Sequence, residues 1–171
     1  EIKLATGCGG SEPTSGLAGN AVVGELSDTI VKEHGTVILS ETSELIGTEE
    51  ILAARAKNED VKNRVLHIVD RFEQHFWNNG EDVRYGNPTP GNKEGGLTTL
   101  EEKSLGCIHK GGTTPIQEVY DYAKQIPAEQ TGLVIMDTPG NDASSIAGML
   151  AGGATLVVFS SGRGTPLGCP L

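Results

Sequence analysis

The sequence predicts a single α/β domain of the three-layer, Rossmann-like type, with a mainly parallel sheet, over residues 1–171. Four short aliphatic runs show little polar alternation, as expected of parallel strands that are covered on both faces. Amphipathic helical patterns lie between these runs, and this alternation favours right-handed crossovers with helices on both faces of the sheet. The length suits one hydrophobic core rather than two. The predicted strands span 2–6, 36–41, 132–137 and 154–160.

The predicted helices follow from apolar repeats and from signals at helix ends. An i, i+4, i+8 apolar repeat indicates a helix around 22–30, and a longer apolar stripe indicates a second one over 61–76. Asp60 is placed to cap the start of this second helix. A segment opened by proline suggests a helix over 115–125, because the first helical turn tolerates the missing N–H. A run of small residues predicts a further helix over 142–151.

Composition excludes several classes of partner. The net charge of -10 argues against binding to nucleic acid, which needs clustered Lys and Arg, and is typical of a well-solvated surface. No apolar run approaches the ~18 residues that a membrane span needs. Three widely spaced cysteines without a C-x-x-C pair or a secretory segment favour a reducing cytoplasm. Since the chain starts almost within a strand and stops without a terminating element, we expect a fragment of a larger protein.

The loops that follow the predicted strands contain the polar residues of greatest interest. In open parallel sheets, ligands bind beyond the carboxyl ends of the strands. The loops at these ends read "GCGGSEPTSG", "ETSELIGTE", "DTPGND" and "SSGRGTPLG". We therefore expect their polar side chains to share one rim of the sheet: Cys8, Glu41, Glu44, Asn141, Asp142 and Arg163.

Each of these rim residues also has a simpler interpretation. Cys8 at a helix start would have a lowered pKa and could bind a metal as a thiolate, although a lone cysteine is commonly just packed. Glu41 and Glu44 could bind a hard cation or move a proton, or could be surface charge, whereas Glu49 and Glu50 suit the first turn of a helix. Asn141 could cap a helix whose N-terminus faces the rim. Arg163 between glycines suits bidentate capture of a carboxylate, or is a surface residue in a turn.

Residues 78–114 show no long periodic pattern and are predicted to form an inserted active-site loop. Irregular connections beyond ~12–15 residues inside a compact domain are usually functional. Within this loop, Thr98 and Glu101 have the capping-box spacing and predict one or two helical turns. Asn92, Lys93 and Lys103 have no local structural reason to be where they are.

Four motifs in this order carry a resemblance to a known family: "CGGSEPTSG", "NPTPGNKEGGLTTLEEKSLGC", "PGNDA" and "SSGRGTPLG". Together they resemble the C-terminal catalytic region of the altronate and galactarate dehydratase family, to which the large subunit of sulfolactate sulfo-lyase is also similar. The resemblance implies a lyase that removes water from a sugar acid to give a 2-keto-3-deoxy acid, with a divalent metal, commonly iron. It also implies further parts of the enzyme: a small N-terminal domain or subunit, and a middle α/β domain.

The chemistry of such an elimination suggests roles for the candidates. Removal of a proton alpha to a carboxylate requires neutralisation of the developing charge, and the leaving hydroxyl requires a proton or a metal. We expect Cys8, Glu41 and Cys107 to be ligands of Fe²⁺ or Mn²⁺. We assign Glu41, Lys93 and Lys103 to proton transfer or charge neutralisation. The substrate-binding candidates are Asn92, Asn141, Asp142, Arg163 and Thr165.

Two alternatives stay open from the sequence. A sulfo-lyase would use the same enolate chemistry but expel sulfite from (2R)-sulfolactate. A non-catalytic carboxylate-binding or assembly domain would leave the chemistry to the missing parts, although a scaffold does not require so many polar groups on one rim. The identity of the sugar acid, the metal, and whether the protein forms a homo-oligomer are not determined by the sequence.

Overall fold

The computed structural model describes residues 2–169 and contains a five-stranded sheet over this range. The strand order is β3-β4-β2-β1-β5, and all four neighbouring pairs are parallel. The predicted α/β class with a parallel sheet is therefore confirmed, and the four predicted strands exist with shifted ends. The strands are β1 (Lys3–Gly9), β2 (Thr36–Leu39), β3 (Ile116–Tyr120), β4 (Gly132–Met136) and β5 (Leu156–Ser161).

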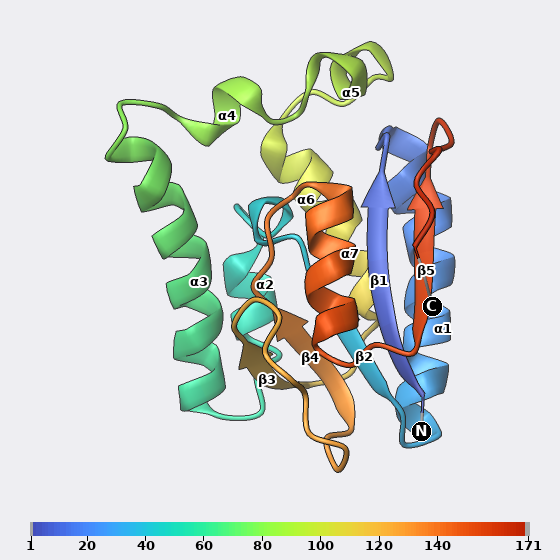
Figure 1. The fold of residues 1–171 in the computed structure, drawn as a ribbon. Coiled ribbons are helices and arrows are strands. Elements are labelled where there is room, and N and C mark those ends of the chain that lie inside the picture. The colour runs from blue at the N-terminus through green and yellow to red at the C-terminus, as the bar shows by residue number, and fades with distance from the viewer. Residues whose placement is uncertain (1, 170–171) are drawn as a thin grey trace.

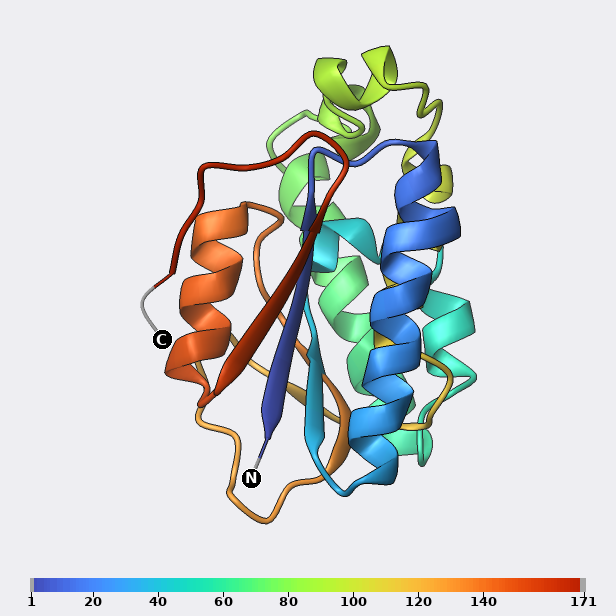
Figure 2. The same ribbon diagram turned by 90° about the vertical axis from the view of Figure 1, so that its right-hand side faces the viewer.

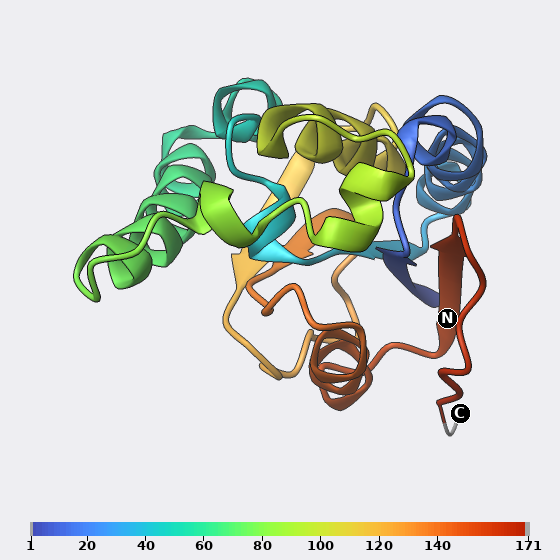
Figure 3. The same cartoon turned by 90° about the horizontal axis from the view of Figure 1, so that it is seen from above.

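Helices cover both faces of this sheet (Figures 1–3). Figure 3 shows α7 alone on one face and the other long helices on the opposite face. None of the helices within 2–169 combines the length and the apolar composition that a membrane span requires. The helices of the populated face are α1 (Asn20–Lys32), α2 (Glu49–Ala53), α3 (Glu59–Trp77) and α6 (Leu100–Ile108), and α7 spans Asp142–Ala151.

The two faces of the sheet carry two separate apolar cores. Successive side chains of a strand point to opposite faces, so neighbouring strand residues enter different cores. Leu4 and Val37 pack with residues of α3 and α6, whereas Ala5 and Ile38 pack with Ile146 and other residues of α7. This explains why the strands read as continuous aliphatic runs, since both of their faces are buried.

The predicted helix over 115–125 is wrong, because this segment begins with strand β3. Ile116 and Val119 are buried, and β3 pairs with β4 through contacts such as Ile116 with Leu133. The backbone of β4 needs a partner on this side, and that tertiary requirement outweighs the local helix signal of a leading proline. The cap of α3 is also shifted: Asn58, not Asp60, accepts a hydrogen bond of 2.9 Å from the Val61 N–H.

Residues 78–114 are more regular than their composition suggests. Besides α6 they contain α4 (Val83–Gly86), α5 (Pro90–Glu94) and a 3₁₀ turn at His109–Gly111. Figures 1 and 2 show α4 and α5 crossing above the carboxyl ends of the strands. Helix α6 then runs back along the sheet. We call α4 and α5 the roof, because they cover the carboxyl edge of the sheet, and α6 the wall, because it lies beside that edge.

Two side-chain caps stabilise the roof and the wall. Thr89 and Asn92 form a capping box at the start of α5. Thr99 caps α6 by accepting a hydrogen bond of 3.1 Å from the Glu102 N–H, one position later than the predicted pair. The predicted helical turns are therefore present but shifted by one residue, which is within the usual uncertainty of helix ends.

Close backbone contacts at glycines fix α6 and the following turn against the rest of the domain. A Cβ added at Gly16 would lie 2.7 Å from the Gly106 Cα, and one added at Gly24 of α1 would collide with the His109 carbonyl oxygen. Ser27 of α1 donates a hydrogen bond of 2.6 Å to the Lys110 carbonyl. These contacts determine where the residues at the end of α6 are placed.

We predict that Gly24→Ala destabilises the protein by about 1–3 kcal/mol, because the new methyl group would overlap the backbone next to His109. Urea unfolding followed by circular dichroism measures this change. Gly86→Ala is the matched control, because a Cβ there meets nothing within 4 Å. Equal unfolding free energies for the two variants would contradict the prediction.

Candidate functional site

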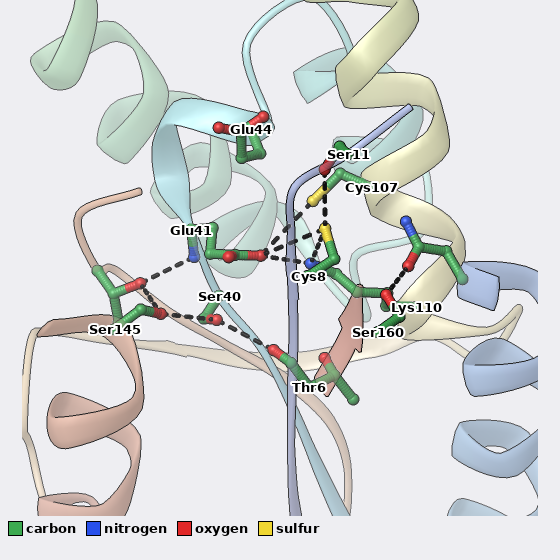
Figure 4. Close-up of polar contacts among 12 residues, drawn as sticks. Thr6, Cys8, Ser11, Ser40, Glu41, Glu44, Cys107, Lys110, Ser145 and Ser160 are labelled. Atoms are coloured by element: carbon green, nitrogen blue, oxygen red, sulfur yellow. Dashed lines mark hydrogen bonds and ion pairs between the residues drawn. The ribbon is translucent and has the colours of Figure 1, made fainter. Parts of the chain in front are cut away.

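A cluster of four ionisable side chains lies buried at the carboxyl end of β1 and β2 (Figure 4). Its members are Cys8, Glu41, Cys107 and Lys110, which we call the buried cluster; their exposed fractions are 8%, 1%, 2% and 0%. The Lys110 ammonium lies 3.0 Å from the Cys8 sulfur and is also in contact with Glu41 Oε2. Each of the two sulfurs lies 3.9 Å from the same oxygen, Glu41 Oε2.

The backbone of β1 and of the turn after β2 positions two of these groups. Cys8 lies near the end of β1, where it pairs in register with Ser160 of β5. Glu41 follows β2 with a φ of 69°, in the left-handed region that residues other than glycine seldom adopt. Its N–H donates a hydrogen bond of 2.8 Å to the Thr138 hydroxyl. A strained conformation held by surrounding hydrogen bonds is typical of a functional site.

The other two groups come from the end of α6 and the turn that follows it. Cys107 and Lys110 are three positions apart, so they project from the same side of this continuous helical path. The glycine contacts and the Ser27 hydrogen bond described above hold this path close to α1. Segments about 100 residues apart thus supply the sulfur and ammonium that meet at 3.0 Å.

Burial and mutual charge shift the pKa values of the two cysteines in opposite directions. A hydrogen bond from Cys107 lowers the pKa of Cys8, and the Lys110 ammonium adds to this effect against the cost of burial. The same Cys8–Cys107 hydrogen bond, together with burial, raises the pKa of Cys107. Cys8 is therefore the thiolate of the pair.

The carboxyl and the ammonium groups complete this balance. Burial raises the pKa of Glu41 to about 8, although the Lys110 charge opposes the shift. Burial lowers the pKa of Lys110, but the charges of Cys107, Cys8 and Glu41 outweigh it and raise that pKa above its ordinary value. The directions of these shifts favour a charged pair of Cys8 and Lys110 over ionisation of Cys107. This balance avoids an uncompensated buried charge, which would be costly.

A polar hollow of about 210 Å³ opens above the buried cluster. It is small beside the ~300–1,000 Å³ of sites for drug-sized ligands and suits a small polar molecule. The loops after β1, β2, β4 and β5 all contribute to it, as does the roof. We call it the rim hollow; its lining residues are Cys8, Gly9, Gly10, Ser11, Glu44, Thr89, Gly91, Asn92, Lys103, Gly140, Asp142 and Arg163.

Three predicted site residues lie in the rim hollow with charged groups. The Lys103 ammonium lies 3.1 Å from Glu44 Oε1 and donates a hydrogen bond of 2.8 Å to Asn87 Oδ1. Burial, followed by the charge of Cys8, raises the pKa of Asp142. Arg163 donates a hydrogen bond to the Gly91 carbonyl and so links the β5 loop to α5. The rim hollow thus contains two cations and two carboxyl groups.

Asn92 also lines the rim hollow, but its side chain has structural partners. Asn92 Oδ1 accepts a hydrogen bond of 3.1 Å from the Thr89 N–H, and Asn92 Nδ2 donates one of 2.9 Å to the Ser11 carbonyl. The expectation that Asn92 lacks a local structural reason for its position is therefore wrong, because Asn92 forms a capping box with Thr89. Among the described residues, the Lys103 ammonium has no local partner, as expected, and its partners Asn87 and Glu44 lie further away in the sequence.

The remaining predicted residues lie outside the lining of the rim hollow. Asn141 caps α7 by accepting a hydrogen bond of 3.1 Å from the Ser144 N–H. Thr165 Oγ1 accepts one of 3.1 Å from the Leu167 N–H. Asn141, Asp142 and Thr165 line a second, shallow groove that shares Gly140 and Asp142 with the rim hollow. Lys93 is exposed on α5.

Lys110 is the residue of the buried cluster that the sequence analysis missed as a candidate. Its segment, "GCIHKGG", contains a signal in retrospect: a lysine one helical turn after a cysteine, followed by two glycines. That spacing places both groups on one side of a helical path but does not show that the side is buried. Glu44 was expected at the rim, and its contact with Lys103 gives it a defined partner.

Three atoms of the buried cluster could hold a metal ion. The ligand atoms of Cys8, Glu41 and Cys107, which we call the triad, lie within 4.8 Å of one another. Two thiols and one carboxyl oxygen suit a transition metal better than Mg²⁺ or Ca²⁺, which prefer oxygen ligands. The expected grouping of these three residues is confirmed, and their donor set is compatible with a metal.

The fold and the site together are those of an α/β protein of the open parallel-sheet class, in which ligands bind at the carboxyl edge of the sheet. The whole of residues 1–171 matches the family described as D-galactarate/Altronate dehydratase, C-terminal. The chain belongs to this family, as its four motifs indicated.

Curated relatives agree with this assignment. The chain is 40% identical over 168 residues to an altronate dehydratase of Bacillus subtilis, covering 98% of this chain and 33% of that protein. It is 39% identical to a galactarate dehydratase (L-threo-forming) of Escherichia coli, over 98% of this chain and 32% of that protein. It is also 37% identical to (2R)-sulfolactate sulfo-lyase subunit beta of Chromohalobacter salexigens, over 100% of this chain and 44% of that protein.

The chain therefore spans about a third of the length of the dehydratases it matches. Dehydratases are lyases, so the family is one of enzymes that cleave bonds by elimination. The remaining two thirds of those relatives lie outside the match to this chain.

We predict that the stability of the protein falls as Glu41 ionises. Because folding raises the pKa of Glu41 to about 8, from an ordinary value of about 4.3, the folded state holds this proton more tightly than the unfolded chain. The resulting stabilisation is complete below about pH 4 and is lost as the pH rises to about 8. Between about pH 5 and pH 8 the unfolding free energy should fall by on the order of 3 kcal/mol more than in Glu41→Gln.

Urea unfolding over this pH range measures the difference, because Gln cannot ionise and mimics the protonated carboxyl group. Glu94→Gln, an exposed position on α5, is the control and should keep the pH dependence of the unchanged protein. Identical pH dependence for the unchanged protein and Glu41→Gln would refute the assignment of the shift to Glu41.

Proposed function

We propose that this chain forms part of a hydro-lyase that removes water from a sugar acid of the altronate or galactarate type and yields a 2-keto-3-deoxy acid. The observation that carries this proposal is the buried cluster opening into a small hollow with cationic and carboxyl side chains. The names of the dehydratase relatives support the substrate class. Since the chain spans about a third of those relatives, an N-terminal domain or subunit and a middle α/β domain are part of the proposal.

The two cationic side chains of the rim hollow, Lys103 and Arg163, are proposed to bind the substrate carboxylate. Arg163 presents a planar guanidinium suited to bidentate binding, and Lys103 presents an ammonium held by Glu44 and Asn87. Positive charge near the carboxylate makes the neighbouring carbon acid stronger, because it neutralises charge that develops as the proton leaves.

Proton transfer requires a group that faces the reacting carbons. The proposed acid/base groups are Lys103, which lines the rim hollow, and Glu41, which belongs to the buried cluster below it. The pKa of Glu41, about 8, lies near neutrality, as an acid/base group requires. Lys93 ranks behind Lys103, because it is exposed on α5 and would need the roof to move. Asp142, with its raised pKa, lies where it could donate to a leaving hydroxyl.

The shallow groove next to the rim hollow suits the rest of a polyhydroxy acid. Asn141 and Thr165 line this groove, and Asp142 belongs to both sites. The Asn92 side chain donates a hydrogen bond to the Ser11 carbonyl. We therefore propose that Asn92 positions α5 over the loop after β1 rather than contacting the substrate. A six-carbon acid could then place its carboxyl end in the rim hollow and its hydroxyl groups along the groove.

A divalent metal is the proposed cofactor, and the triad of Cys8, Glu41 and Cys107 would hold it. Fe²⁺ fits this donor set better than Mn²⁺, because thiolates are soft ligands and Mn²⁺ favours oxygen. When bound, such an ion would act as a Lewis acid toward an oxygen of the substrate. A cytoplasmic location and a homo-oligomeric assembly stay predictions.

Elimination of sulfite from (2R)-sulfolactate is the second candidate function. The sulfo-lyase subunit beta is matched over a larger share of its own length than the dehydratases are. Both reactions begin with removal of a proton alpha to a carboxylate, so the same cations and acid/base groups would serve either. A scaffold without catalysis is disfavoured, because a buried cluster of four ionisable groups is costly to build for assembly alone.

We expect the full-length protein, supplied with Fe²⁺ or Mn²⁺, to dehydrate altronate or galactarate. The screen should include glucarate and sulfolactate, and should detect the 2-keto product or released sulfite. Formation of sulfite alone would select the second candidate. Absence of turnover on all four acids, with metal bound, would contradict both.

We predict that Arg163→Ala in the full-length protein lowers kcat/KM at least about tenfold, because it removes a charge-assisted contact to the substrate carboxylate. Steady-state kinetics on the acid that is turned over measures this loss. Arg64→Ala is the control, since Arg64 pairs with Glu118 at the far edge of the sheet. Normal kinetics for Arg163→Ala would remove this residue from the site.

A further inference from the structure

The triad that could hold a metal already contains a cation. The Lys110 ammonium contacts Glu41 Oε2 and lies 3.0 Å from the Cys8 sulfur. These are two of the three ligand atoms that lie within 4.8 Å of one another. Lys110 therefore uses the same lone pairs that a divalent ion would need.

Space and charge both oppose simultaneous binding of the two cations. The two sulfurs each lie 3.9 Å from Glu41 Oε2, so an ion bonded to all three atoms at the ~2.0–2.3 Å typical of metal–ligand bonds would sit within this small triangle. The Lys110 side chain is fully buried, so its charge is shielded from bulk solvent. Repulsion between an ammonium and a divalent ion at such a separation is strong, because burial weakens screening.

We propose that the Lys110 ammonium and a divalent metal ion compete for the triad, so that Lys110 sets the metal affinity of the site. This rests on the metal site of the proposed function and adds a residue that controls its occupancy. In the structure, the ammonium lies against Cys8 Sγ and Glu41 Oε2, where the metal would need to bind. Binding of an ion requires the ammonium to leave Glu41 and Cys8.

Backbone contacts that hold Lys110 in place make displacement of its ammonium by a metal more costly. Its carbonyl accepts a hydrogen bond of 2.6 Å from Ser27, and the turn that contains it packs against Gly24 of α1. The backbone therefore cannot withdraw readily, and the side chain itself must move aside. Moving the Lys110 side chain costs free energy. This cost reduces the net free energy of metal binding and so lowers the apparent metal affinity of the triad.

The test is a titration with Co²⁺ of the full-length protein and of Lys110→Met, in the absence of substrate. Met fills a similar volume without the charge. Co²⁺ bound by thiolates gives a charge-transfer absorption, so the readout does not depend on turnover. We expect Lys110→Met to bind one Co²⁺ with a dissociation constant at least about tenfold lower than that of the unchanged protein.

Three further variants make the result specific. Lys57→Met removes an exposed lysine and should leave Co²⁺ binding unchanged. Cys107→Ser, introduced together with Lys110→Met, should weaken Co²⁺ binding and reduce the thiolate absorption, because it removes one of the two sulfur ligands of the triad. Lys110→Gln keeps a hydrogen-bond donor without the charge, and replaces Lys110→Met if that variant does not fold with or without Co²⁺.

Equal or weaker Co²⁺ binding by the Lys110 variants would overturn the competition, as would the absence of thiolate absorption in all of the proteins. These outcomes are distinct from failure of the proposed function. Tighter Co²⁺ binding by Lys110→Met would support the competition even if no sugar acid is turned over. Turnover of a sugar acid with unchanged Co²⁺ affinities would support the enzyme and refute the role of Lys110.

Discussion

The contact of the Lys110 ammonium with Cys8 and Glu41 is the interaction on which the site depends. A lysine with no exposed surface is stable only beside opposite charge, and the thiolate of Cys8 supplies it. The left-handed backbone conformation of Glu41 directs its carboxyl group toward the same ammonium. Chemistry and folding are thus coupled, since loss of either member of the charged pair, Cys8 or Lys110, leaves a buried charge uncompensated.

The segment of residues 78–114 connects this cluster with the rim hollow above it. Helix α6 ends with Cys107 and leads directly to Lys110, while its first turns present Lys103 to the rim hollow. Capped short helices, rather than an irregular loop, give these side chains defined positions. One segment therefore supplies groups to both the buried cluster and the rim hollow, and movement of α6 would alter both together.

Under the proposed function, the same geometry would serve both the dehydratases and the sulfo-lyase that this chain resembles. Cations that neutralise a carboxylate, and a cluster able to move a proton or to hold a metal, serve the step that the two eliminations share. Under this proposal, the shallow groove next to the rim hollow is where the leaving group would be distinguished. The acidic surface and the small size of the rim hollow are consistent with a small-molecule substrate in either case.

The sequence by itself determined the parallel α/β fold, the family, and the placement of Cys8 and Glu41 at one rim, because strand runs and loop motifs are local and parallel strands share one carboxyl edge. It named Cys107 as a metal-ligand candidate, but the packing of α6 and the following turn against the domain decided that Cys107 lies beside them. It did not determine that 116–120 is a strand, that Asn92 and Lys103 have structural partners, or that Lys110 lies at the centre of the cluster. Those properties depend on contacts between segments far apart in the chain. Burial and charge balance arise only when these segments meet, so only the tertiary structure decided them.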